Sequence, residues 1–209
     1  MNEKLTILLA DDLKEFKDSK EEDISLVTET LNNPESFGKI MNKYSPRITR
    51  YIYRIAGSSS FEIDDLLQNI FIKVYKNLNN FDSALSFSAW IYRIAHNEAI
   101  DYIRKLKIRP RTIMNDEEED FLFNIPDKNN DLIEDLNNNM IKDHILEIFS
   151  KIREKYRSVL ILKYLEDKDY NEISDILKIP LGTVATLLHR AKKEFKIIAI
   201  DNNINKLDI

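Results

Sequence analysis

Turn-forming residues are scarce in this chain, which holds only three glycines and five prolines among 209 residues. An all-β sandwich or barrel needs a turn after every strand, at a spacing of roughly eight to twelve residues, and Gly and Pro supply most of those turns. Hydrophobic residues make up 43% of the chain, which is enough for a packed core and argues against global disorder. The sequence therefore predicts an all-α fold.

Apolar residues recur at helical spacing in the first half of the chain. Over 61–78 they fall three and four positions apart on one continuous helix face, formed by Ile63, Leu66, Leu67, Ile70, Phe71, Val74, Tyr75 and Leu78. The same spacing predicts helices over 37–56, with a kink at Pro46, and over 87–106. Met41 and Phe37 are assigned to the buried face of the first, and a polar loop covers 79–86. This half is expected to be a bundle of three to four helices.

The second half carries a sharper pattern. Segments 139–152 and 156–166 are amphipathic, and Asp169 followed by Glu172 forms a capping-box arrangement. A short helix, a break at 178–182 and a longer helix to about Lys196 with a basic outer face then follow. This order is typical of a helix-turn-helix, although periodicity alone also fits a plain helical hairpin.

Charge is strongly segregated along the chain. Segments 36–111 and 136–200 carry net charges of +7 and +3, and the acidic stretch 112–135 between them carries −8. We interpret this stretch as a linker, which either is a solvated tether or occupies a basic channel in a partner. The expected domains are an acidic extension (1–25), a helical domain (26–111), a linker (112–138), a helix-turn-helix domain (139–200) and a tail (201–209).

The predicted helix over 87–106 has a basic outer stripe that suits nucleic acid. The stripe contains Arg93, His96, Asn97, Asp101, Arg104 and Lys105, and its cations favour the approach of phosphates. An ion pair between Asp101 and Lys105 is expected within it. Aromatic residues interleave with the stripe, namely Phe81, Phe87, Trp90, Tyr92 and Tyr102. They either stack on unpaired bases or belong to the core.

Several function classes are excluded by composition. The absence of cysteine rules out disulfides and thiolate chemistry, and the three scattered histidines make a metal site improbable. Isolated glycines form no phosphate-binding loop. We therefore expect no enzyme, no cofactor and no metal. Apolar runs are too short for a signal peptide or a membrane span, so we expect no membrane insertion and a cytoplasmic protein.

Two blocks of the sequence resemble a known family. Residues 64–81 with 87–105 resemble the second conserved region of bacterial sigma factors, and 156–196 resembles the fourth. Their order and the acidic linker are similar to the extracytoplasmic-function group of the sigma-70 family. The resemblance implies an initiation factor that binds core RNA polymerase, recognises minus-ten and minus-thirty-five promoter elements and assists strand opening. It also implies an anti-sigma partner.

The resemblance assigns roles to individual residues. Polymerase binding falls on Asp65, Leu66, Gln68, Asn69 and Phe71, where Asn69 replaces the family's usual Glu. Capture of the melted minus-ten strand falls on Asn79, Asn80, Phe81, Ser86, Trp90, Arg93, Asn97 and Arg104. Reading of the minus-thirty-five duplex falls on Thr183, Thr186, His189, Arg190 and Lys193. Ala185 and Leu187 stand where relatives carry basic groups, which predicts weaker or atypical recognition.

Two alternatives remain open at the level of sequence. A one-component regulator would share the helix-turn-helix, but it needs an α/β receiver or ligand domain, and residues 1–111 show no such strand pattern. A sigma-like decoy that only sequesters a partner is favoured by Ala185 and Leu187. Trp90 and the basic stripe favour the initiation factor instead.

Overall fold

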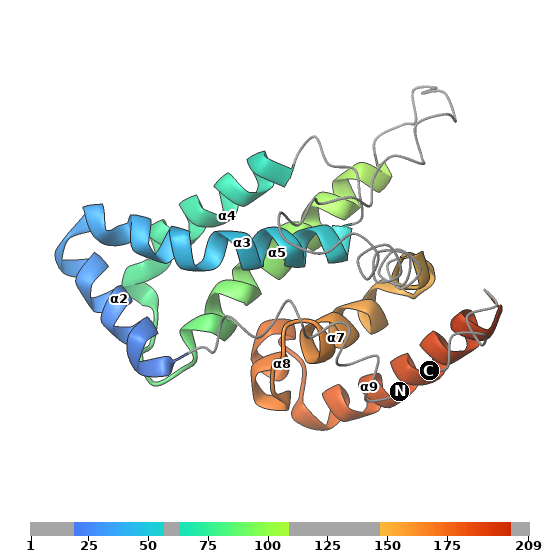
Figure 1. Ribbon diagram of the computed structural model, residues 1–209. Helices are drawn as coiled ribbons and strands as arrows, with labels where there is room; N and C mark the ends of the chain where they lie inside the picture. The colour runs from blue at the N-terminus through green and yellow to red at the C-terminus, as the bar shows by residue number, and fades with distance from the viewer. Residues whose placement is uncertain (1–18, 57–62, 109–146, 202–209) are drawn as a thin grey trace, which may run out of the picture.

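The computed structural model describes residues 19–56, 63–108 and 147–201, and within these ranges it consists of helices and turns, with no strand (Figure 1). The all-α prediction is confirmed. Helices α2 to α5 form one group, and α7 to α9 form a second group that lies against it. The acidic stretch 112–135 lies outside the described residues.

Helix α2 (Lys20–Asn32) starts at Ser19, whose side chain accepts a hydrogen bond from the backbone N–H of Glu22. Asp23 is buried beneath it, where it accepts a 2.7 Å hydrogen bond from the Tyr44 hydroxyl and lies 2.9 Å from Lys43 Nζ. Both partners belong to α3 (Phe37–Ala56), so α2 is anchored to the bundle. The first turns of α2 thus lie in the segment that the sequence analysis assigns to an N-terminal extension.

The centre of the first group is α5 (Phe87–Ile108), which packs against both α3 and α4 (Ile63–Asn77). Helix α3 runs through Pro46, which costs it one backbone hydrogen bond because proline lacks an N–H. The predicted apolar stripe of α4 is buried apart from Leu67, which is partly buried, and Tyr75, which is 46% exposed. Tyr75 lies at the edge of the stripe, and its ring meets that of Phe37 edge-on at 5.0 Å. Met41, predicted inward, is also exposed.

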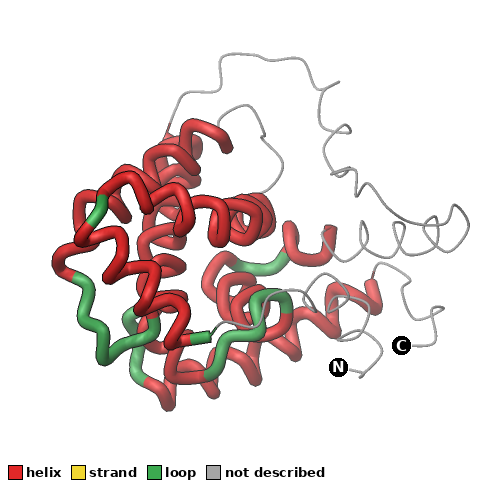
Figure 2. Tube along the Cα trace, turned by 60° about the vertical axis from the view of Figure 1, so that its left-hand side comes forward, coloured by secondary structure: helices red, strands yellow, loops and turns green. Residues whose placement is uncertain are grey.

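The second group contains α7 (Glu154–Tyr164), α8 (Tyr170–Leu177) and α9 (Leu181–Asp201), preceded by a helical turn over 147–151 (Figure 2). The predicted capping box is present, since Asp169 and Glu172 exchange hydrogen bonds of 2.8 and 3.0 Å. Lys178 ends α8 in the left-handed conformation, with φ of 54°. The resulting turn sets α9 across α8, and α9 extends one turn beyond the predicted Lys196.

The two groups meet directly. Helix α5 packs along α8, α3 contacts α7, and a single cluster of buried apolar residues runs through both groups (Figure 1). The sequence predicts two helical units, but nothing in its periodicity indicates that they share an interface. None of the described helices combines the length and the apolarity that a membrane span requires.

Candidate functional site

The outer face of α4 carries the polar members of the set predicted to bind polymerase. Asp65, Gln68 and Asn69 are exposed, whereas Leu66 and Phe71 are buried, with 7% and 3% of their surfaces accessible. The two apolar residues hold α4 against the bundle and so fix the direction in which the polar residues point. The structure therefore separates the predicted set into exposed and supporting members.

Two apolar side chains extend this exposed face of α4. Ile72 and Tyr75 are 43% and 46% exposed, and they lie four and seven positions after Gln68, which places them on the same side of the helix. The sequence analysis did not single out Ile72 and assigned Tyr75 to the core. The sequence feature that could have identified Ile72 as a surface contact is that it is apolar yet falls outside the predicted buried stripe.

The loop after α4 covers an aromatic cluster. Asn79 and Asn80 are exposed in a short 3₁₀ turn, η4 (Leu78–Asn80), and Phe81 follows them. The Phe81 ring lies 5.1 Å from the ring of Phe87 and 5.5 Å from that of Trp90, and the last two rings stack at 5.5 Å. Trp90 is only 8% exposed. In this structure the aromatic residues pack as core beneath the loop, the second of the two interpretations given above.

The start of α5 is held by Ser86, whose Oγ accepts a 3.1 Å hydrogen bond from the backbone N–H of Ala89. The same hydroxyl donates a 3.1 Å hydrogen bond to Glu172 of α8. Further along α5, Asn97 and Arg104 are exposed and Arg93 is partly buried. Part of the basic stripe is thus exposed. The start of α5, at Ser86, contacts the second group of helices.

The acid of the α5 stripe pairs differently from the prediction. Asp101 lies 3.4 Å from the guanidinium of Arg104, one turn away, whereas the sequence analysis expected Lys105 as its partner. Both members of the observed pair are exposed, so the pair contributes little to stability. Arg104 therefore stays accessible to an anionic ligand.

His96 does not contribute a positive charge to the α5 surface. Burial, assisted by the nearby Arg104 guanidinium, lowers the pKa of His96 to about 4. Its Nδ1 lies 2.9 Å from the hydroxyl of Tyr51, which is itself fully buried. At neutral pH the imidazole is thus uncharged and belongs to the packing of α5 against α3.

The lowered pKa of His96 predicts a specific dependence of the free energy of unfolding on pH. Its pKa is near 6.5 in the unfolded chain and about 4 in the folded one, so the unfolded state binds the extra proton as pH falls below 6.5. Stability is then lost, by about 2 kcal/mol between pH 7 and pH 5. Urea unfolding at both pH values should show this loss in the wild type and not in His96→Asn. His189→Asn, which changes an exposed histidine, should keep the wild-type pH dependence, and equal pH dependence of all three chains would contradict the prediction.

All five residues predicted to read duplex DNA are exposed on α9. They are Thr183, Thr186, His189, Arg190 and Lys193. The Thr186 hydroxyl donates a 3.0 Å hydrogen bond to the Gly182 carbonyl within the same helix. The N-terminal half of α9 thus presents a short polar and basic surface of the size that fits a major groove.

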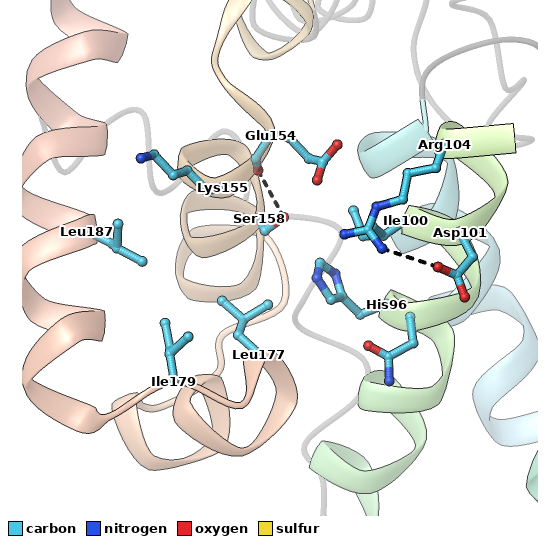
Figure 3. Close-up of a pocket in the computed structure, with 11 residues that line it drawn as sticks. His96, Ile100, Asp101, Arg104, Glu154, Lys155, Ser158, Leu177, Ile179 and Leu187 are labelled. Atoms are coloured by element: carbon cyan, nitrogen blue, oxygen red, sulfur yellow. Dashed lines mark hydrogen bonds and ion pairs between the residues drawn. The ribbon is translucent and has the colours of Figure 1, made fainter. Parts of the chain in front are cut away.

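A cavity of about 520 Å³ lies between α5 and the second group of helices (Figure 3). His96, Ile100 and Arg104 line it from α5, and Leu187 faces them from α9. Leu177 and Ile179 complete its apolar side. Leu187, which stands where relatives carry a basic group, is here partly buried and faces α5. Among the described residues no group of three or more metal-ligating side chains occurs.

Comparison with family models gives two matches. Residues 40–108 match the model of sigma-70 region 2, and residues 143–195 match that of sigma-70 region 4. Among characterised proteins, the ECF RNA polymerase sigma factor SigW of Bacillus subtilis is 34% identical, over 78% of this chain and 88% of its own length. The ECF RNA polymerase sigma-E factor of Escherichia coli K12 is 28% identical, over 83% and 88% respectively.

Solved structures share the fold. CnrH, in complex with the cytosolic domain of CnrY, aligns with a TM-score of 0.63 over 86% of this chain and 97% of its own, at 18% identity. The sigma factor RpoE of Bartonella quintana, in complex with the anti-sigma factor NepR, aligns with a TM-score of 0.59 over 78% and 96%, also at 18% identity. At this identity the likeness concerns the architecture of both helical groups.

Proposed function

The chain belongs to the extracytoplasmic-function RNA polymerase sigma factors of the sigma-70 family, and on that premise we propose how its surfaces divide the work of starting transcription. It is a promoter-recognising transcription initiation factor. The observation that carries the proposal is the co-occurrence of both family regions, in order, with exposed polar faces on α4 and α9. Neither the fold nor the similarity to known proteins favours the decoy alternative that Ala185 and Leu187 raise.

Core RNA polymerase binds the outer face of α4. Asp65, Gln68 and Asn69 supply polar contacts there, and the exposed Ile72 and Tyr75 supply apolar contact area beside them. A mixed surface of this kind suits an interface, since an apolar centre with a polar rim is the usual anatomy. Leu66 and Phe71 act indirectly, by holding the helix in place.

Promoter DNA is read by two helices. Asn79, Asn80 and the exposed side of α5, with Asn97 and Arg104, face the melted non-template strand at the minus-ten element. The N-terminal half of α9 enters the major groove of the minus-thirty-five element. Ala185 and Leu187 offer no cation there, so fewer phosphates are neutralised and affinity for this element is lower than in a typical relative.

Regulation and location follow from the same assignment. The structural neighbours CnrH and RpoE are solved in complex with the cytosolic domain of CnrY and the anti-sigma factor NepR, and we infer an anti-sigma partner for this chain as well. We also infer that it works in the cytoplasm, where polymerase and DNA are, and that it has no catalytic site of its own. The acidic stretch 112–135, outside the described residues, is proposed to lie in a basic channel of the polymerase.

Reconstituted transcription tests this proposal. Core polymerase alone should give no discrete transcripts from a library of genomic fragments, and addition of the full chain should give a defined set of start sites. Mapping those starts should reveal two shared sequence elements upstream. If the chain binds core polymerase yet yields no start sites on any fragment, it is a decoy that sequesters a partner and not an initiation factor.

A further inference from the structure

The loop between η4 and α5 carries no buried side chain over residues 82–85, all of which are exposed. Its shape is therefore set by hydrogen bonds and not by packing. Two of these bonds lie within the loop. The Asp82 carboxylate accepts a 2.9 Å hydrogen bond from the backbone N–H of Ala84, and the Asp82 carbonyl accepts a 3.0 Å hydrogen bond from the N–H of Leu85. Together they close a tight turn of the kind that aspartate favours.

A third hydrogen bond reaches the loop from the N-terminal helix. The Lys20 ammonium, in the first turn of α2, donates a 2.8 Å hydrogen bond to the carbonyl of Ala84, 64 positions away in the sequence. The start of α2 accordingly lies beside this loop (Figure 1). A hydrogen bond from a cationic donor is stronger than one between neutral groups. Lys20, which the sequence analysis assigns to an N-terminal extension, thus ties α2 to the loop predicted to meet the minus-ten strand.

These bonds hold one peptide group of the loop from both sides. The carbonyl of Ala84 and the N–H of Leu85 belong to the same peptide unit, which is planar. Lys20 binds its oxygen and the Asp82 carbonyl binds its hydrogen, so the plane cannot turn without breaking one of the two bonds. The orientation of this plane sets the direction of the Leu85 side chain, which is apolar and 42% exposed.

Helix α2 offers a firm base for this contact. Asp23, one helical turn after Lys20, is buried and accepts a 2.7 Å hydrogen bond from the hydroxyl of Tyr44 in α3. Val27, one turn further on, belongs to the buried core, and α2 also contacts η4 and α5. The backbone from which Lys20 extends is thus fixed relative to the loop that it holds.

We propose that Lys20 is a positioning residue for minus-ten recognition, and that it acts through the peptide group between Ala84 and Leu85 without touching DNA itself. The proposal rests on the function proposed above and gives the start of α2 a part in promoter reading. Side chains that read bases must be held within about 0.5 Å of the productive geometry, and a loop that samples several conformations presents the productive one for only part of the time. By fixing this peptide group, Lys20 raises the fraction of molecules whose loop is ready for a base.

Hydrogen exchange in the full chain tests the contact itself, without polymerase or DNA. Lys20→Met keeps the apolar part of the side chain and removes the donor. The amide of Leu85, whose N–H is bonded to Asp82, should then exchange at least roughly fivefold faster, because the loop opens more often. Lys20→Arg, which keeps a cationic donor, should keep the wild-type rate. Lys39→Met is the matched control, since this exposed lysine of α3 donates a 2.6 Å hydrogen bond to Glu29 of α2 and not to the loop.

Base selection by the holoenzyme tests the role in promoter reading. Core polymerase carrying each full-length chain selects from a pool of single-stranded DNA of randomised sequence. Lys20→Met should reduce the preference for the favoured base at one position of the minus-ten element roughly fivefold and leave the preferences at the other positions unchanged. Lys20→Arg and Lys39→Met should select the wild-type sequence. The slope of log affinity against log salt should also stay at its wild-type value in Lys20→Met, because a positioning residue neutralises no phosphate.

The possible failures are distinguishable. Unchanged exchange of the Leu85 amide in a folded Lys20→Met chain overturns the positioning contact. Faster exchange with wild-type base selection overturns its role in promoter reading. Weaker binding of every sequence, with a salt slope shallower by about 0.7, would show that Lys20 binds a phosphate directly. Absence of any selected sequence with the wild-type chain, while the exchange difference persists, overturns the proposed function and with it the promoter role of Lys20, whereas the contact between α2 and the loop stands.

Discussion

A chain with Asp65→Ala and Gln68→Ala is expected to bind core RNA polymerase roughly 100-fold more weakly than the wild type. Both side chains are exposed on α4, one helical turn apart on one face, and beside the exposed Ile72. Loss of two polar contacts on such a surface leaves their partners on the polymerase unpaired. The free energy of unfolding should change by less than about 0.5 kcal/mol, because neither side chain is buried.

Glu21→Ala with Asn32→Ala provides the matched control. It also removes one acid and one amide, both exposed, but from α2. Affinity for core polymerase is measured by titration with labelled chain, and helical content by circular dichroism. The control should bind as the wild type does. Equal binding of the double variant on α4 would show that this face is not the polymerase contact.

The helices themselves could be predicted because each buries one stripe of apolar residues. The stripe of α4 is found at the predicted positions, and the capping box of Asp169 and Glu172 marks the start of α8 as expected. Tyr75 and Met41 were predicted to be buried and are exposed, for the same reason. Both lie at the edge of a stripe, where periodicity gives the direction of a side chain only to within part of a turn.

The interface between the groups could not be predicted, for a physical reason. Periodicity states that a face is buried and not what covers it, so the packing of α5 on α8 has no signature in either helix alone. Glu166 and Lys168 are both buried, and their partners, among them Arg54 and Ser88, lie far away in the chain. Only the tertiary structure brings these groups together.

The aromatic residues near the promoter-facing loop show a related limit. Composition suggested either base stacking or core packing for Trp90, and the two interpretations use the same side chain on the same helix face. In the structure the rings of Phe81 and Phe87 both pack against Trp90. A residue of this kind supports the loop from beneath, which is a prerequisite for whatever the loop binds.

Arg190→Ala with Lys193→Ala is expected to weaken binding of the full chain to the minus-thirty-five duplex by roughly 30-fold at low salt. The two cations lie three positions apart on the exposed face of α9, where they most directly reach phosphates. Each lost phosphate contact lowers the slope of log affinity against log salt by about 0.9, so the double variant should lose nearly two units of slope. Lys192→Ala, which changes an exposed lysine turned towards the Tyr164 ring at 5.3 Å, is the control and should keep the wild-type slope.

Loss of phosphate contacts and loss of base reading have different signatures in a randomised duplex pool. The double variant should bind every sequence more weakly and keep the wild-type order of preference, because phosphates carry no sequence information. Thr186→Ala should instead change which bases are preferred at one or two positions, with the salt slope unchanged, since a threonine hydroxyl and methyl group meet base edges. Selection from the pool at two salt concentrations separates the two effects. Absence of any duplex binding by the wild type at low salt would remove the reading role from α9.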